Sequence, residues 1–153
     1  MIRNELYKET LARRVVSENL DRSGFAHSER VAKMTATAHG ERKGIEYLAA
    51  LLHDVVEDSN VTIPMIELLF GSEVSTVVDA LTRRITETYA EYIERLSENK
   101  IAKSIKLFDL ADHFDESATL SDSLSVRYAK ATKYLSEWKD KPDQCQQQYT
   151  RGK

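Results

Sequence analysis

The sequence predicts an all-α protein, a bundle of about seven or eight helices. Its 153 residues include only five glycines and two prolines, so few positions interrupt a helix. Apolar residues recur at spacings of three and four, and no segment shows sustained alternation of apolar and polar residues. A chain of this length suits one domain built around a single core.

The first half of the chain contains three predicted helices. The first spans about residues 4–20, and a turn at residues 21–24 separates it from the second, which runs from about His27 to His39. The third spans about residues 45–57 and is apolar around most of its circumference, which marks it as the central and most buried helix. Core candidates on the first two helices are Leu6, Leu11, Val15, Leu20, Val31, Met34 and Ala38.

Capping signals divide the second half of the chain. Thr62 is the predicted N-cap of a short helix that carries Pro64 in its first turn and ends near Gly71. Ser72 is the predicted cap of the helix that follows. The remaining predicted helices cover about residues 72–84, 88–97, 99–114 and 121–139.

The predicted domain organisation is simple. Residues 1–140 are expected to form one domain, and the polar residues 141–153 are expected to form a flexible tail. The formal net charge is −3 and the pI is near 5.8, so the chain lacks the general positive charge that attracts a nucleic-acid backbone. A small basic pocket for a phosphorylated metabolite remains compatible with this composition.

Three features bear on where the chain works. No apolar run approaches the roughly 18 residues that a membrane span needs. The amino-terminal residues MIRNELYKET lack the apolar segment of a secretory signal. The single cysteine, Cys145, excludes an intramolecular disulfide and fits a reducing compartment. We therefore expect a cytoplasmic protein without membrane or nucleic-acid partners, and the sequence leaves a homo-oligomer open.

The end of the predicted central helix carries the most informative chemistry. An apolar run from Leu48 leads into four ionisable residues, His53, Asp54, Glu57 and Asp58. Residues three or four apart share a helix face, so these side chains would meet at one pocket. Such groups are costly to place beside a core unless something pairs them, and a bound metal ion is one such partner.

A metal needs further ligands from elsewhere in the chain. His27 follows the glycine-containing turn, and Asp109 continues the apolar stripe of Ile101 and Ile105, where a carboxylate requires a partner. The predicted ligands are therefore His27, His53, Asp54 and Asp109. Two imidazoles and two carboxylates suit a divalent ion such as Mn²⁺, Fe²⁺, Co²⁺, Ni²⁺ or Zn²⁺. Glu57 and Asp58 would then serve as general acid and base beside a metal-activated water.

Several of these residues also have an ordinary structural interpretation. Asp109 would equally form a buried ion pair with Lys103, Lys106 or an arginine, and Glu57 and Asp58 would equally be solvated acids at a helix end. Arg83 lies at a predicted helix C-terminus, where cations are favoured with or without a substrate. The sequence leaves these alternatives open.

The order of these residues resembles a known family. The motifs LLHDVVEDS (51–59), ALTRR (80–84), ETYAEYIER (87–95) and IKLFDLAD (105–112) follow a histidine at position 27. This H…HD…D pattern is similar to that of the HD-domain metal-dependent phosphohydrolases, and within them to the small hydrolases related to the RelA/SpoT hydrolase domain. The resemblance covers about residues 20–135. It implies an HD-domain helical bundle.

The resemblance also implies an activity and a set of site residues. Members of this branch remove the 3′-pyrophosphate from (p)ppGpp and use Mn²⁺. Their metal ligands fall on His27, His53, Asp54 and Asp109, and their catalytic pair falls on Glu57 and Asp58. The candidate substrate-binding residues are Arg22, Ser23, Arg83, Lys106 and His113.

The chain departs from the family pattern near the substrate-reading residues. Asp21 stands where a basic residue is expected, His113 stands where an asparagine is common, and the segment up to the first histidine is shortened. Two alternatives to a guanosine-3′,5′-bis(diphosphate) 3′-pyrophosphohydrolase therefore remain. One is a nucleoside mono- or triphosphate phosphohydrolase of the same superfamily, and the other is a non-catalytic nucleotide-sensing HD domain.

Overall fold

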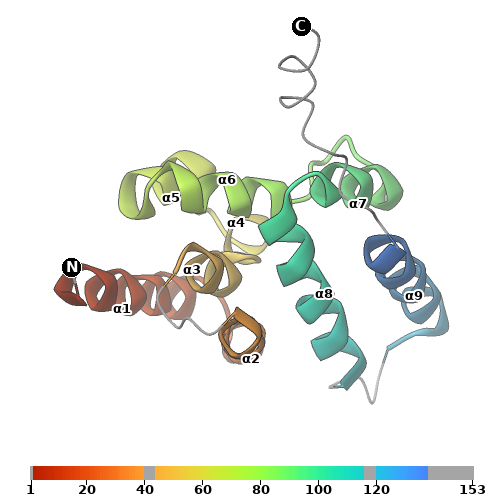
Figure 1. Cartoon of the computed structure of the whole chain (residues 1–153), viewed down its shortest axis with the longest axis horizontal. Helices are drawn as coiled ribbons and strands as arrows, with labels where there is room; N and C mark the ends of the chain where they lie inside the picture. Colours follow the sequence, from red (N-terminus) through yellow and green to blue (C-terminus); the bar gives the residue numbers. More distant parts are fainter. Residues whose placement is uncertain (1, 40–43, 116–119, 138–153) are drawn as a thin grey trace, which may run out of the picture.

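The computed structural model describes residues 2–39, 44–115 and 120–137, and this part of the chain is helical without a strand, which confirms the all-α class (Figure 1). Eight of its helices have at least eight residues, which agrees with the predicted number of about seven or eight, and α4 is an additional single turn of four. The helices are α1 (Ile2–Asn19), α2 (Arg22–His39), α3 (Ile45–Leu52), α4 (Val55–Asp58), α5 (Ile63–Phe70), α6 (Ser72–Leu81), α7 (Tyr89–Ser97), α8 (Lys100–Asp115) and α9 (Asp122–Glu137).

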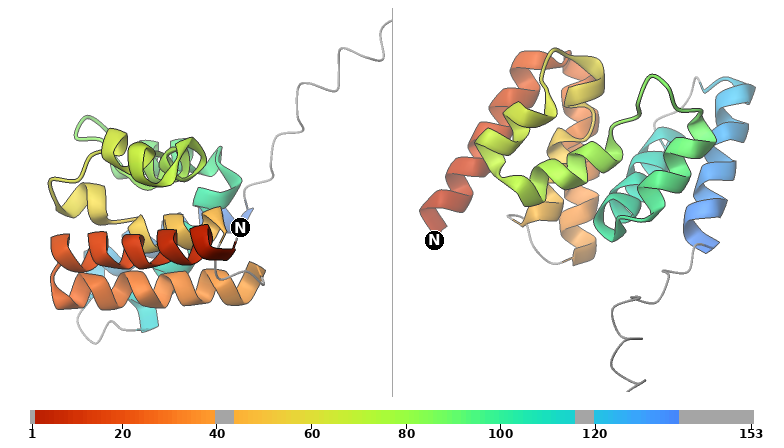
Figure 2. Two further views of the ribbon diagram at one scale, coloured as in Figure 1. Left: turned by 90° about the vertical axis from the view of Figure 1, so that its left-hand side faces the viewer. Right: turned by 90° about the horizontal axis from the view of Figure 1, so that it is seen from above.

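The centre of the fold is α3, as its apolar sequence predicts. Residues 47–52 of this helix are all buried, and α3 packs against α1, α2, α6 and α8. The helices α1 and α2 lie side by side on one flank of the molecule, whereas α7 and α9 lie beyond α8 on the other (Figures 1 and 2). The helix α8 therefore joins the two flanks, with α2 on one side and α9 on the other.

The predicted helix over residues 45–57 is interrupted, and the interruption shapes the site. The helix α3 ends at Leu52, and α4 begins at Val55. His53 still has helical dihedrals, but Asp54 adopts φ −100° and ψ −11° and starts α4 in a new direction. In a continuous helix, adjacent side chains point about 100° apart. His53 and Asp54 nevertheless reach the same point, since Oδ2 of Asp54 lies 3.1 Å from Nε2 of His53.

The helix α2 begins earlier than predicted. Residues 22–24 were expected to form a turn, but they are the first turn of α2. The side chain of Asp21 caps this helix, because its Oδ1 accepts a hydrogen bond of 2.8 Å from the Gly24 amide. His27 therefore lies in the second turn of a helix rather than at its start.

The segment from α5 to α6 follows its capping signals with two corrections. Thr62 precedes α5, and Pro64 lies in its first turn, as predicted. Gly71, with φ +98°, ends α5 and is itself the N-cap of α6, so Ser72 is a helical residue and not the cap. The helix α6 ends at Leu81 because Thr82 is extended, which places Arg83 in the loop to α7 rather than in the helix.

The last three helices lie within two residues of their predicted bounds where the structure describes them. Thr88 and Glu91 form a capping box at the start of α7. On α1, Ala12 and Val16 are buried, whereas Leu6 is 55% exposed and does not belong to the core. The predicted tail at 141–153 lies outside the described residues. No helix in the described ranges is long and apolar enough to cross a membrane.

Candidate metal centre

The four predicted metal ligands come from three separate segments and meet at one point. His27 lies on α2, His53 and Asp54 form the turn between α3 and α4, and Asp109 lies on α8. Nε2 of His27 lies 3.2 Å from Nε2 of His53 and 3.0 Å from Oδ1 of Asp109. Oδ2 of Asp54 lies 3.1 Å from Nε2 of His53 and 3.6 Å from Nε2 of His27.

The two imidazoles present the same nitrogen to the centre. Nδ1 of His53 lies 2.8 Å from the carbonyl oxygen of Ala50, and because a carbonyl only accepts, Nδ1 carries the hydrogen. Nδ1 of His27 lies 2.7 Å from Oδ2 of Asp112 in the same manner. The Nε2 atoms are thereby directed toward each other, which is the orientation that a shared ligand requires.

The donor set fits a divalent ion. One ligand atom each from His27, His53 and Asp109 lies within 4.8 Å of the other two. Donor atoms that each lie about 2.0–2.2 Å from one ion are separated by roughly 3 to 3.5 Å, which is the spacing of the two Nε2 atoms. The three residues are buried, so an ion there would have its charge balanced by the carboxylates rather than by water.

The surroundings of Asp109 explain how its charge is tolerated inside the protein. The residue is 1% exposed. Its Oδ2 lies 2.6 Å from Nζ of Lys106, and its Oδ1 faces His27, His53 and His113. Burial would raise the pKa of Asp109, but the Lys106 ammonium and the imidazoles hold it well below its ordinary value. The buried ion pair with Lys106 and the convergence with the other candidate ligands therefore coexist, one on each carboxylate oxygen.

The electrostatics of the histidines favour positive charge at the centre. Burial alone would lower the pKa of His53, but Asp54 and Asp109 raise it well above its ordinary value. Burial and repulsion from His53 would lower the pKa of His27, but its contacts with Asp109 and Asp112 together raise it above its ordinary value. A point that stabilises protons on two neighbouring imidazoles is equally suited to a cation.

The two predicted acid–base residues lie on α4, at the exposed edge of this centre. Oε1 of Glu57 accepts a hydrogen bond from the backbone N–H of Arg83. The pKa of Glu57 is raised because neighbouring protein displaces part of its water. The same loss of water, together with repulsion from Asp54, raises the pKa of Asp58. Raised pKa values make both carboxyls more suitable for exchanging protons near neutral pH.

Two of the predicted substrate residues lie directly beside the four candidate ligands, His27, His53, Asp54 and Asp109, which we call the ligand cluster. Lys106 pairs with Asp109, and its ammonium also lies 5.5 Å from the ring centroid of Tyr92. Nε2 of His113 lies 3.2 Å from Oδ1 of Asp109, and its ring lies 4.7 Å from that of His27. Because His113 is partly exposed, it forms the rim of the centre rather than its interior.

The other three predicted substrate residues lie further out. Arg22 and Ser23 are exposed on the first turn of α2, and Ser23 precedes His27 by four residues and so shares its helix face. Arg83 contacts the site through its backbone N–H on Glu57, whereas its guanidinium donates to the carbonyl oxygen of Glu87 at 2.8 and 3.2 Å. In the structure, Lys106 and His113 therefore contact the candidate ligands, whereas Arg22 and Ser23 lie at the periphery of the site.

Asp112 and Arg30 belong to the site and were not predicted. Asp112 is 4% exposed and accepts the hydrogen of His27 Nδ1, while Arg30 binds both of its oxygens. The sequence held a signal for Asp112, since it follows Asp109 by three residues and shares its helix face. It held none for Arg30, which meets Asp112 only through the packing of α2 on α8.

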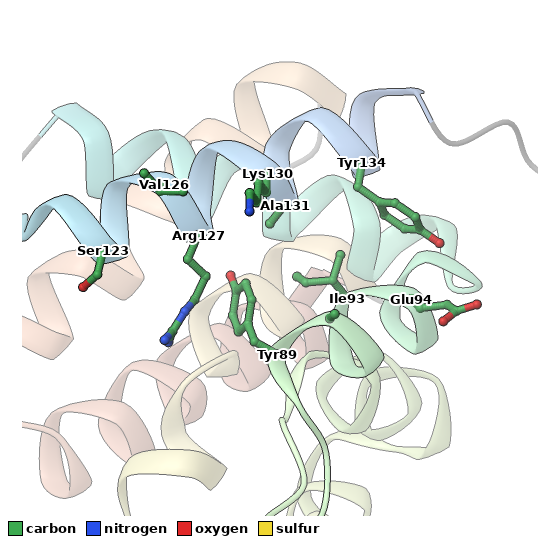
Figure 3. A pocket seen from close by; sticks show the side chains of 10 residues that line it. Tyr89, Ile93, Glu94, Ser123, Val126, Arg127, Lys130, Ala131 and Tyr134 are labelled. Atoms are coloured by element: carbon green, nitrogen blue, oxygen red, sulfur yellow. The ribbon is translucent and has the colours of Figure 1, made fainter.

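A cavity of about 560 Å³ lies between α7 and α9, apart from the ligand cluster (Figure 3). Its walls are mostly apolar and include Ile93, Val126 and Ala131, and the ring of Tyr89 forms one side, next to Arg127. A series of rings connects the two places, from Tyr89 to Tyr128, then His113 and then His27, with centroids 6.3, 5.3 and 4.7 Å apart.

Comparison with known proteins places this chain in a family. Residues 24–136 match the HD domain, so the chain belongs to the HD-domain family. The segment includes the four candidate ligands, Glu57 and Asp58.

Two relatives are informative. A protein of Synechocystis sp. described as a probable guanosine-3′,5′-bis(diphosphate) 3′-pyrophosphohydrolase is 34% identical over 121 residues, which cover 71% of this chain. The chain spans only 16% of the length of that protein. A solved structure described as a metazoan ortholog of SpoT that hydrolyzes ppGpp superposes with a TM-score of 0.68 over 90% of this chain and 87% of its own, at 21% identity. The second relative shows that the helical fold is shared.

Proposed function

We propose that this chain is a metal-dependent phosphohydrolase that acts on a nucleotide, and that its substrate is a guanosine 3′,5′-bis(diphosphate) from which it removes the 3′-pyrophosphate. The observation that carries the proposal is the convergence of His27, His53, Asp54 and Asp109 beside two exposed carboxyls. The names of the relatives from Synechocystis and from a metazoan support the choice of substrate.

The proposed ligands are His27, His53, Asp54 and Asp109, and the proposed ion is Mn²⁺, with Fe²⁺, Co²⁺, Ni²⁺ or Zn²⁺ also compatible with this donor set. When bound, such an ion lowers the pKa of a coordinated water and polarises a phosphoryl oxygen.

The side chains around the ligands would supply the other parts of the chemistry. Glu57 and Asp58, with their raised pKa values, would accept and return protons at the open edge of the site. Lys106 would balance the charge of Asp109. His113, Arg22, Ser23 and Arg83 would contact the phosphates or the nucleoside.

One observation favours the second candidate, a nucleoside mono- or triphosphate phosphohydrolase. Asp21, which stands where the family has a basic residue, is used as the cap of α2, and its charge contributes to the raised pKa of Asp58. A negative charge near the acid–base pair disfavours a substrate with many phosphates on that side, so within this candidate it favours the nucleoside monophosphate. His113, in place of an asparagine, also changes the hydrogen-bonding groups at the rim.

The experiment that separates these candidates is a nucleotide panel with the Mn²⁺-loaded protein, read by ³¹P NMR of the products. Pyrophosphate from ppGpp supports the first candidate. Orthophosphate from a nucleoside monophosphate, or tripolyphosphate from a nucleoside triphosphate, supports the second. Binding of a nucleotide without turnover of any of them would instead identify a sensing domain.

A further inference from the structure

We infer that Asp112 and Arg30 are positioning residues for the metal centre, which together hold the imidazole of His27 with its Nε2 directed at the other ligands. This inference rests on the proposed metal-dependent function. The quantity that tests it is the affinity for the ion itself, which does not depend on which nucleotide is the substrate.

The first step of the argument is the contact between Asp112 and His27. Oδ2 of Asp112 lies 2.7 Å from Nδ1 of His27, and Oδ1 of Asp109 lies 3.0 Å from Nε2 of the same ring. Two carboxylates one turn apart on α8 therefore engage the two nitrogens of one imidazole. The hydrogen at Nδ1 is fixed by Asp112, so the Nε2 lone pair is kept for a ligand.

The second step of the argument is the bidentate ion pair between Arg30 and Asp112. Nε and Nη2 of Arg30 lie 2.8 Å and 2.9 Å from the two oxygens of Asp112. A planar guanidinium that binds both oxygens fixes the plane of the carboxylate as well as its distance. Its charge also offsets the cost of burying Asp112, whose pKa is held below its ordinary value by Arg30 and His27 in spite of burial.

The contrast with the other histidine shows why His27 needs this support. Nδ1 of His53 is fixed by the carbonyl of Ala50, three residues earlier in its own segment. His27 has its Nδ1 partner on a different helix, 85 residues away. The orientation of His27 therefore depends on how α2 packs against α8. The ion pair of Arg30 with Asp112 links these two helices about one turn away from His27 and Asp109.

The test is isothermal titration of the full chain with Mn²⁺, and with Co²⁺ as a second ion. Loss of such a supporting partner weakens metal binding by about 10- to 100-fold, which is the effect expected for Asp112→Asn. The matched control is Asp115→Asn, which removes the same charge from an exposed position on the same helix and should leave the affinity unchanged.

Arg30→Met gives a second, independent variant, since it keeps the aliphatic stem and leaves Asp112 in place. Arg30→Met should lower the affinity for the ion less than Asp112→Asn does. The double variant should bind the ion no more weakly than the weaker of the two single variants, because both residues act through His27. Arg30→Lys should recover part of the loss.

A merely structural role would lower the melting temperature of the metal-free protein and leave the affinity of the folded variants unchanged. If both Asp112→Asn and Arg30→Met bind the ion with affinities within twofold of the wild type, the inference is wrong while the proposed function still stands. Failure of the wild type to bind either ion would overturn the proposed function together with it. If Asp112→Asn does not fold, the Arg30 variants decide.

Discussion

The candidate ligands and the candidate acid–base pair belong to one site, but they are held in opposite ways. His53 and Asp109 are 2% and 1% exposed, and each is fixed by at least one further contact. Glu57 and Asp58 are exposed on α4, a helix of only four residues. The turn at Asp54 is the border between these two halves.

The difference indicates a division of tasks. The buried half is organised before any substrate arrives, because its partners come from α2 and α8. The exposed half depends on α4 and on the contact between Glu57 and the backbone of Arg83, in the loop before α7. We therefore expect changes in the buried half to alter metal content and stability, and changes in the exposed half to alter rate alone.

The largest effect is expected for Asp109→Ala. The variant should lose its metal, and it should also lose about 3 kcal/mol of unfolding free energy, because it leaves the largely buried ammonium of Lys106 without its partner. Elemental analysis and urea unfolding measure the two losses. The double variant Asp109→Ala/Lys106→Met should recover stability but not metal, and recovery of the metal would contradict the assignment of Asp109 as a ligand.

The next effect is expected for Asp54→Ala. This residue should be as important for metal and turnover as Asp109, but its side chain is 28% exposed and has no buried lysine to leave unpaired. We therefore expect metal content and activity to be lost with a smaller change in stability. Full metal occupancy and turnover in this variant would show that the proposed ligand set is wrong.

Glu57→Gln tests the exposed half. The amide keeps the size of the side chain but does not exchange a proton, so the rate should fall by about 10²- to 10⁴-fold while the metal is retained. Glu67→Gln, an exposed change on α5, is the matched control and should leave both unchanged. A Glu57→Gln variant that loses its metal would remove the distinction between the two halves.

The pH dependence of the metal-free protein gives a further test of the buried half. The folded-state pKa values of His27 and His53 are raised, so their contribution to stability is complete below the unfolded value of about 6.5 and is lost as pH rises through the folded values. The melting temperature of the metal-free protein should therefore fall over that interval. Excess Mn²⁺ should reverse the trend, because the ion binds deprotonated imidazoles. If the melting temperature depended on pH in the same way with and without Mn²⁺, the ion and the protons would not be binding to the same imidazoles.

The smallest effect is expected at Asp21, where two variants separate capping from charge. Asp21→Asn keeps a good cap for α2, whereas Asp21→Ala should cost about 1 kcal/mol of stability. Both remove the negative charge near Asp58, so both should lower the KM for a polyphosphate substrate by about two- to fivefold. Steady-state kinetics beside thermal unfolding make the comparison, and a change in KM for Asp21→Ala alone would point to the helix rather than the charge.

The sequence predicted the position of α3 and the residues that gather at its end, because ionisable groups at the end of an apolar run need partners. It did not predict the break after Leu52. The spacing of His53, Glu57 and Asp58 is compatible with a continuous helix, and Asp54 also lies beside His27, which belongs to another helix. For the same reason, the ion pair of Arg30 with Asp112, 82 positions apart, has no local signal.

The start of α2 is a different kind of error. Asp21 and Gly24 are typical turn residues, so the sequence alone predicts a turn at residues 21–24. In the structure Asp21 is a cap and Gly24 is the third helical residue, where a Cβ would come within 3.3 Å of Leu20. Both interpretations use the same residues, and only the packing of α2 decides between them.

His27 and Asp109 are 82 positions apart, and the turn that carries His53 and Asp54 lies between them. A fragment must extend from His27 to Asp109 to contain all four candidate ligands. The ligand set is therefore incomplete until α8 has been synthesised and has packed against α2 and α3. During synthesis, an ion that prefers this site is therefore captured only after most of the fold is complete. Metal uptake should then follow the docking of α8 rather than initiate folding.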